Sequence, residues 1–324
     1  MNKLVLPQSK TIGEWSYLGI EKHFQKMLSH EAAVLQDRDP EQLHQMRIGM
    51  RRLRTAVTSF TPALDLPKAA SEKQIGKIAR ILGSLRDLDV LQETLHKGYQ
   101  PKLPTKERKA LKQAYVYLEK KRCKALTQVR EALQGKPHQK LKQTLKRWLK
   151  KPTYKEIAQM PAAAVLPDLL LPIVSSLLLH PAWLVGVDLQ DTGSQTPKQL
   201  KPAAVESLLA IRGSVIHDLR KQAKRVRYQM NLFTELYSPT YKDYVEDMKQ
   251  IQGILGDIQD SMVLDEFLNS VFHSDLKHKA PQLAELLQAN RYKSWQQWQT
   301  LQQNYLKPET RQAFRQILLT ESGN

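Results

Sequence analysis

A histidine and three arginines recur with helical spacing early in the chain. On an α-helix they fall in one row about 80° wide and about three turns long. This first row consists of His44, Arg47, Arg51 and Arg54. The opposite face of the same helix is apolar and carries Met46, Met50, Leu53, Val57 and Phe60. The helix is therefore predicted to have one face in a core and another that presents positive charge.

The same pattern returns 173 residues later, where HDLRKQAKRVR (217–227) aligns without gaps with HQMRIGMRRLR (44–54). The second row consists of His217, Arg220, Lys224 and Arg227. A further segment, ILG followed by D and VL, recurs at the same distance, at 81–91 and at 254–264. Because two separate motifs share one offset, we expect a tandem duplication of two helical halves.

Arginine forks suit phosphate oxygens, and histidine adds a charge that switches near neutral pH. Three interpretations of the rows compete. In the first, the arginines are solvated and pair with acids on neighbouring helices, although few carboxylates occur inside either motif. In the second, the rows bind nucleic acid without sequence preference. In the third, the two rows face one another and line a channel for a flexible polyanion.

The elements that carry these rows are predicted to be helices. Apolar residues recur at three- and four-residue spacing, alternating β-patterned segments are missing, and there are only 13 glycines in 324 residues. The fold class is therefore all-α. The single cysteine, Cys123, excludes an intramolecular disulfide and a thiolate zinc site.

Positive charge is concentrated in one segment. The chain has a formal net charge of +18, and residues 102–155 contain 18 Lys and Arg against three acids. Such an imbalance favours a polyanionic partner or an anionic surface. Lysine-rich helices are nevertheless common, so the segment indicates no particular ligand.

One segment resembles a membrane span. Nineteen uncharged residues lie between Asp168 and Asp188, close to the length that crosses a bilayer. Pro172 and Pro181 are expected to limit the helix to about three turns. We therefore expect a buried core helix and no membrane association.

The two motif pairs, HQMRIGMRRLR with LGSLRDLDVL and HDLRKQAKRVRY with LGDIQDSMVL, resemble the conserved histidine α-helical domain (CHAD). The resemblance implies one domain over 14–316, with a repeat at 14–157, a repeat at 162–316, and flexible tails at 1–13 and 317–324. It implies two four-helix bundles related by a pseudo-twofold axis. The implied activity is binding of inorganic polyphosphate in a basic groove between the bundles, with association with polyphosphate granules. A triphosphate-tunnel catalytic domain, which often accompanies this family, is not expected here.

The resemblance carries the ligand-facing role to the eight residues of the two rows. Lys224 keeps the charge of Arg51 but not the fork. A second tier of candidates is Arg52, Arg225, Lys22, His23, Lys26, His30, Lys112, Lys120, Lys121 and Lys124. Asp87 and Asp260 are expected either to tether an arginine of each row or to form a helix-end salt bridge.

Two other function classes are weighed against polyphosphate binding. His217-Asp218 matches the dipeptide of metal-dependent HD phosphohydrolases, but the first row has His44-Gln45, so a metal site is not repeated. We expect no catalysis, metal or cofactor. Nucleic-acid binding is the main alternative, although only Tyr228 lies beside a row as a stacking platform. The N-terminus lacks the apolar stretch of a secretory signal, so a cytoplasmic location is expected.

Overall fold

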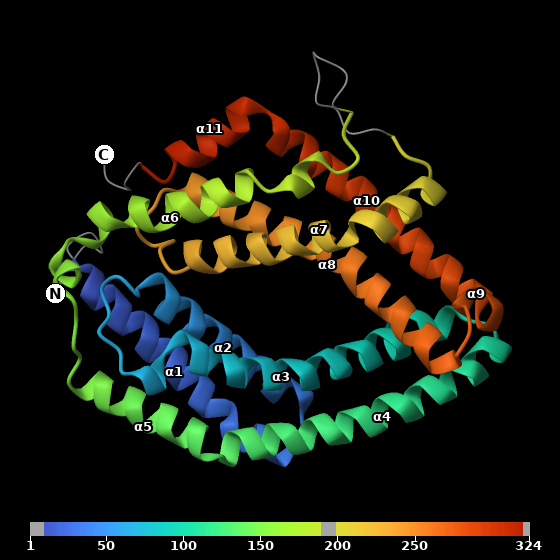
Figure 1. Ribbon diagram of the computed structural model, residues 1–324, viewed down its shortest axis with the longest axis horizontal. Coiled ribbons are helices and arrows are strands. Elements are labelled where there is room, and N and C mark those ends of the chain that lie inside the picture. Colours follow the sequence, from blue (N-terminus) through green and yellow to red (C-terminus); the bar gives the residue numbers. More distant parts are fainter. Residues whose placement is uncertain (1–9, 189–198, 320–324) are drawn as a thin grey trace, which may run out of the picture. The chain divides into compact units, whose positions relative to one another are not determined.

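The computed structural model describes residues 10–188 and 199–319 (Figure 1). Within these residues the chain is helical and forms no β-strand, which confirms the all-α prediction. The outer parts of the two expected tails, 1–9 and 320–324, lie outside the described residues. The inner end of the expected N-terminal tail is ordered differently: Ile12 and Gly13 belong to the first helix and are buried.

The α-helices are α1 (Ile12–Gln36), α2 (Pro40–Ser59), α3 (Glu72–Glu93), α4 (Thr105–Gln134), α5 (Lys136–Lys150), α6 (Ala162–Leu178), α7 (Pro202–Met230), α8 (Pro239–Phe272), α9 (Leu276–Lys279), α10 (Pro281–Leu306) and α11 (Pro308–Gln316). Shorter helical turns are η2 (Lys68–Ala70), the π-helical η3 (Thr94–Tyr99), η4 (Gln100–Lys102), η5 (Glu156–Gln159) and η6 (Pro181–Leu184). Five α-helices begin with proline, which has no N–H to lose there and a backbone angle suited to a helix start.

The chain divides into two compact units. Unit 1 comprises 1–101 and 115–165, and unit 2 comprises 102–114 and 166–324. This division differs from the expected repeats, because the first turns of α4 belong to unit 2. Glu107 explains the difference: its carboxylate accepts the backbone N–H groups of Gln282 and Leu283 at the start of α10, both at 3.1 Å. Gln113 donates to the carbonyl of Val271 at 3.1 Å.

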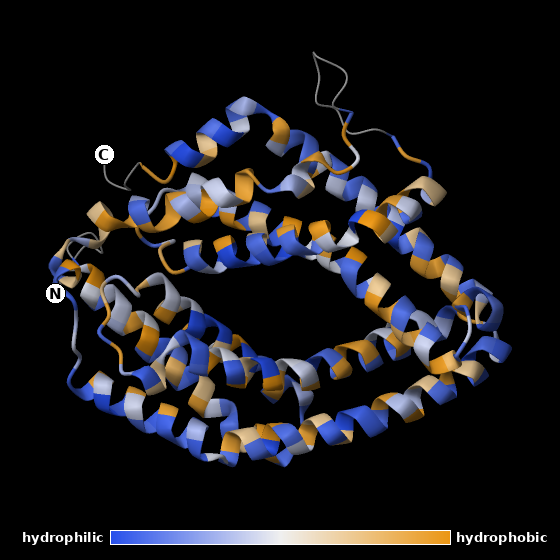
Figure 2. Ribbon diagram, in the orientation of Figure 1, coloured by the Kyte–Doolittle hydropathy of each residue, from blue (hydrophilic) through white to orange (hydrophobic). Residues whose placement is uncertain are grey.

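In unit 1, α2 crosses α1 closely and packs beside α3. Asp39 caps α2, since its side chain accepts the N–H of Glu41 at 2.9 Å. At the crossing, a Cβ on Gly49 would lie 2.9 Å from the backbone nitrogen of Met27, so only glycine fits. The apolar face predicted for α2 is buried, from Met46 to Phe60. Figure 2 shows the expected mixture of hydrophobic and hydrophilic residues along these helices.

In unit 2, α7, α8 and α10 surround an aromatic core. Trp183 stacks on Tyr305 with ring centroids 5.2 Å apart and lies 5.1 Å from the ring of Trp298. Gln302 is fully buried and donates to the carbonyls of Trp183 at 2.8 Å and Val185 at 2.9 Å. These bonds satisfy backbone groups of η6 that would otherwise lack partners in the core.

The apolar segment forms α6, which contains Pro167 and Pro172 and continues to Leu178. The expectation that Pro172 would shorten this helix was wrong. By length and composition Ala162–Leu184 is long and apolar enough to cross a membrane, and 39% of its apolar window is buried. One such helix is weak evidence for a membrane span, because core helices have the same composition. Leu170, Val174 and Leu177 are fully buried, as expected for a core helix.

Candidate anion-binding site

The first row lies on α2 and the second on α7, each opposite the buried face of its helix. Seven of the eight side chains are half-buried, and Arg54 is exposed. The opposite, apolar faces of the two helices are packed in the core through residues such as Leu53 in α2 and Leu219 in α7, which are fully buried. The helix thus holds each row at one rotational position, as the periodicity predicted.

In unit 1 the arginines of the first row lie against α3. Arg47 forms an ion pair with Asp87, with 3.4 Å between Nη2 and Oδ1, and its guanidinium lies over Gly83. Arg54 pairs with Glu72 and lies over Gly76. A Cβ on Gly83 would be 3.6 Å from Nε of Arg47, which is ordinary contact.

In unit 2 the second row lies against α8 in the same manner. Arg220 pairs with Asp260, with 3.3 Å between Nη1 and Oδ1, and lies over Gly256. A Cβ on Gly256 would be 3.1 Å from Nη2 of Arg220, so this approach is tighter than that at Gly83. Arg227 donates to Gln252 at 3.1 Å and lies 5.5 Å from the ring centre of Tyr228.

The acids that pair with the rows come from the following helix, where Asp87 and Asp260 are the aspartates of the second repeated motif. Pairing with neighbouring acids, the first of the three interpretations, therefore holds for Arg47, Arg54 and Arg220. The carboxylates concerned are open to water: Asp87 is 71% exposed and Asp260 58%. Exposed pairs of this kind contribute little stability, so a phosphate can replace the carboxylate at small cost.

Both histidines have a pKa below the ordinary value. Partial burial is the largest cause for each. For His44 the next contribution is the charge of Arg86, and for His217 it is that of Lys221. In the absence of ligand both rings are therefore neutral at pH 7.

The second-tier residues fall into different environments. His23 is buried, and its pKa is lowered to about 4 by burial and then by Arg52, so it carries no charge at neutral pH. His30 interacts through Nδ1 with Gln42 at 2.8 Å. The other second-tier residues are exposed, except Lys26, which is half-buried: Lys22, Arg52, Lys112, Lys120, Lys121, Lys124 and Arg225. Lys112 belongs to unit 2, whereas Lys120, Lys121 and Lys124 belong to unit 1.

Sequence reasoning missed Arg86 as a neighbour of the first row. It lies on α3 and is half-buried. Among the charged residues near His44, it makes the largest contribution to the pKa of that ring. Its position one residue before Asp87 was the available signal, because Asp87 itself contacts the row.

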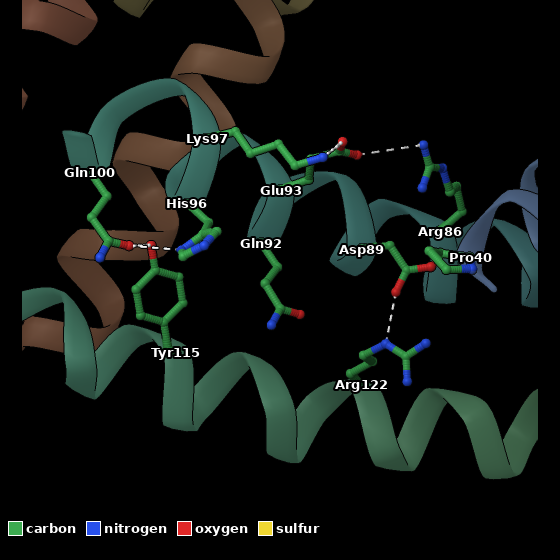
Figure 3. A pocket seen from close by; sticks show the side chains of 10 residues that line it. All are labelled: Pro40, Arg86, Asp89, Gln92, Glu93, His96, Lys97, Gln100, Tyr115 and Arg122. Atoms are coloured by element: carbon green, nitrogen blue, oxygen red, sulfur yellow. Dashed lines mark hydrogen bonds and ion pairs between the residues drawn. The ribbon is translucent and has the colours of Figure 1, made fainter. Parts of the chain in front are cut away.

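Arg86 also lines a pocket of about 600 Å³ in unit 1 (Figure 3). Figure 3 shows Gln92 pointing from α3, and Tyr115 and Arg122 pointing from α4, into the space between the two helices. The charges of the pocket pair with one another: Arg122 donates to Asp89 at 2.8 Å, and Lys97 donates to Glu93 at 3.0 Å. This pocket therefore offers less uncompensated charge than the rows.

In the described ranges, no group of three or more His, Cys, Asp or Glu side chains is placed to hold a metal ion. Asp218, the acid of the HD dipeptide, pairs with Lys221 one turn further along α7.

Comparison with known proteins identifies the family. A search among curated proteins gives no match. The fold is similar to the crystal structure of the CHAD domain from the plant Ricinus communis, with a TM-score of 0.59 and 23% identity over 96% of this chain and 92% of the other. It is also similar to PptA from Streptomyces chartreusis, with a TM-score of 0.54 and 16% identity over 96% and 100% of the two chains. Residues 19–269 match the CHAD domain, and the chain belongs to the CHAD domain family.

Proposed function

We propose that the protein binds inorganic polyphosphate through the two rows and performs no catalysis on it. The observation that carries this proposal is the repeated arrangement of arginines in the two units. In each, an arginine lies over a glycine of the next helix and pairs with an exposed aspartate, as Arg47 does with Asp87 and Arg220 with Asp260. A phosphate group that replaces the aspartate gains a charge-assisted, fork-shaped contact.

Nucleic acid is the second candidate, and the environment of Tyr228 argues against it. Single-strand binders stack bases on exposed aromatic rings. Tyr228 is only 8% exposed and lies beneath Arg227, so its ring presents no face to a base. Polyphosphate has no bases and needs no stacking platform. Association with polyphosphate granules in the cytoplasm is the setting that this proposal implies.

The proposal predicts a steep salt dependence. Each neutralised phosphate should contribute roughly −0.7 to the slope of log K against log salt, by analogy with single-stranded nucleic acid. Engagement of about six to eight cations then gives a slope of about −4 to −6.

A competition titration tests the proposal. Labelled long-chain polyphosphate is bound at about 150 mM salt and displaced with unlabelled polyphosphate, single-stranded RNA or duplex DNA. We expect polyphosphate to compete about 100-fold better per phosphate than either nucleic acid. Equal competition by RNA or DNA would make the rows a general polyanion surface and would overturn the proposal.

A matched pair of variants separates a defined site from diffuse attraction. Arg47→Glu with Arg220→Glu should weaken binding far more than Lys146→Glu with Lys150→Glu, although the net charge changes equally. Both lysines are exposed on α5, which carries neither row. Equal losses would mean diffuse attraction without a defined site.

A further inference from the structure

A third line of cations runs along α3 beside the first row. Lys73, Lys77 and Arg80 are four and three residues apart, so they occupy one face of α3 about 60° wide. All three are exposed. The same helix carries Gly83 and Asp87, against which Arg47 of the first row lies. The α3 line and the first row are therefore neighbours on the surface of unit 1.

The α3 line is uncompensated. Within the described residues no ion pair joins Lys73, Lys77 or Arg80 to a carboxylate, whereas Arg47 and Arg54 of the adjacent row each have one. The next residue on this face of α3 is Ser84, which is neutral and donates to the backbone carbonyl of Arg80. The α3 line thus adds unpaired positive charge beside a row in which two arginines are already paired with acids.

A smaller contribution comes from α1, on the other side of α2. Lys22 and Lys26 both act electrostatically on His23, as does Arg52 of α2, so these three cations share one neighbourhood. In unit 1, cations therefore lie on both sides of the first row.

Unit 2 lacks these flanks. The positions of α8 that correspond to the α3 line, at the same offset of 173, are Glu246, Gln250 and Gly253, and all three are exposed. The position that corresponds to Ser84 is Asp257, whose pKa is raised first by burial and then by the charge of Asp260. Residues 162–188, which include α6, contain no Lys or Arg, so α6 has no counterpart of Lys22 and Lys26 on α1.

We infer that unit 1 supplies most of the affinity for polyphosphate, and that Lys73, Lys77 and Arg80 form a second line of phosphate contacts beside the first row. This inference rests on the proposed function. Cations within a Debye length of about 8 Å act together on a chain of phosphates, and a neighbouring carboxylate cancels part of that attraction. The second row, beside Asp257 and Asp260, is then the weaker half.

Neutralising the α3 line tests the inference by loss. Lys73→Gln, Lys77→Gln and Arg80→Gln together should reduce the magnitude of the salt slope by about 2, and should weaken polyphosphate binding about 30-fold at 150 mM salt. The matched control is Lys140→Gln, Lys146→Gln and Lys150→Gln on α5, which removes the same charge from exposed positions. The control should stay within about threefold of the wild-type affinity, because α5 carries neither the first row nor the α3 line.

A graft on α8 tests the inference through a gain in affinity for polyphosphate, which a loss of folding cannot produce. Glu246→Lys, Gln250→Lys and Gly253→Arg transfer the α3 pattern to unit 2. A side chain on Gly253 meets open space, since no atom lies within 4 Å of its Cβ position. The graft should strengthen binding at least about tenfold and steepen the salt slope.

The outcomes distinguish this inference from the function on which it rests. A wild-type protein that does not bind polyphosphate overturns both. Binding by the wild type, with equal losses in the α3 and α5 triples, leaves the proposed function in place and overturns the inference. A graft without gain also overturns it, whereas loss on α3 together with gain on α8 supports it.

Discussion

The two units contain the same local arrangement of arginine, glycine and aspartate in different electrostatic surroundings. In each, an arginine of the row lies over a glycine and pairs with an aspartate four residues after that glycine. Around this shared geometry, and among the described residues, α3 adds three unpaired cations, while α8 has Asp257 and a Glu246 that pairs with Lys249. The difference teaches that contact geometry and charge are separable: the glycine and aspartate position the arginine, and flanking residues set how strongly an anion is attracted.

A second comparison concerns one arginine in each unit, half-buried in unit 1 and buried in unit 2. Arg122 of α4 makes two bonds to Asp37, at 2.8 and 2.7 Å, and one to Asp89 at 2.8 Å. Arg291 of α10 likewise makes a fork with Glu206 and a pair with Asp265 at 3.2 Å. The two arginines are 169 residues apart and not 173, so the alignment of the motifs does not reveal the similarity.

Removing these arginines should give the largest effects. Asp89 has a side chain only 6% exposed, so Arg122→Ala leaves an unpaired buried carboxylate and should cost about 3–5 kcal/mol of unfolding free energy. Glu206 and Asp265 are each about 30% exposed and can be rehydrated, so Arg291→Ala should cost about 2 kcal/mol. Urea unfolding followed by circular dichroism measures both.

Adding Asp89→Asn to Arg122→Ala serves as the control for this comparison. If the unpaired charge causes the loss, the double variant should recover part of the stability of the single one. Equal costs for Arg122→Ala and Arg291→Ala would show that burial of the partner carboxylate does not decide the effect.

Charge reversal in the rows should give the next largest effect. Arg47→Glu with Arg51→Glu in unit 1 should weaken polyphosphate binding about 100-fold, and Arg220→Glu with Lys224→Glu in unit 2 about tenfold. The difference follows from the cations and acids that flank each row. Titration at one salt concentration measures it, with unchanged circular dichroism as the control for folding. A larger loss in unit 2 would reverse the comparison.

The sequence predicted the elements that follow from periodicity. The two rows and the buried face of α2 were placed correctly, because one helix alone determines which residues share a face. The pairing of Arg47 with Asp87 was foreseen as one of two alternatives. The cations of α3 were missed, because their proximity to the first row depends on how two helices pack and not on spacing within one motif.

Other features depend on tertiary contacts that spacing cannot reveal. The start of α4 belongs to unit 2 because Glu107 caps α10, far along the chain. His23 has the residue type of a phosphate contact, but packing buries it and holds it neutral. Pro172 lies inside α6, although proline disfavours a helix interior.

The helix crossing in unit 1 should show a smaller, purely steric difference. Gly49→Ala places a Cβ against the backbone of Met27 and should cost about 1–3 kcal/mol of unfolding free energy. The corresponding residue of unit 2, Gln222, bonds to Ser176 of α6 at 2.6 Å, and Gln222→Ala should cost about 1 kcal/mol or less. Gly253→Ala, in open space on an exposed helix, should stabilise the protein by up to about 1 kcal/mol. Thermal unfolding of the three variants measures these differences, and a neutral Gly49→Ala would show that the crossing can open.

Protonation of the rows should give the smallest effect. The pKa values of His44 and His217 lie below the ordinary value in the free protein, and a bound polyanion favours the charged ring and raises both. Binding therefore takes up protons and tightens as pH falls, beginning at the raised pKa and complete below the lowered one. At fixed ionic strength we expect affinity to be about threefold to tenfold higher at pH 5.5 than at pH 7.5, with little change between pH 7.5 and 8.5.

The charges that face each ring differ, and this difference ranks the two histidines. Arg86, Glu41, Arg51 and Arg47 act on His44, whereas Lys221, Arg220, Asp218 and Asp260 act on His217. Two carboxylates already favour the charged form of His217, and only one favours that of His44. A phosphate that replaces Asp260 removes one of these carboxylates, so the net rise in the pKa of His217 is smaller. His44→Gln should therefore remove more of the pH dependence than His217→Gln. Affinity that does not vary with pH would exclude both histidines from binding, and a larger effect of His217→Gln would assign the stronger phosphate contact to unit 2.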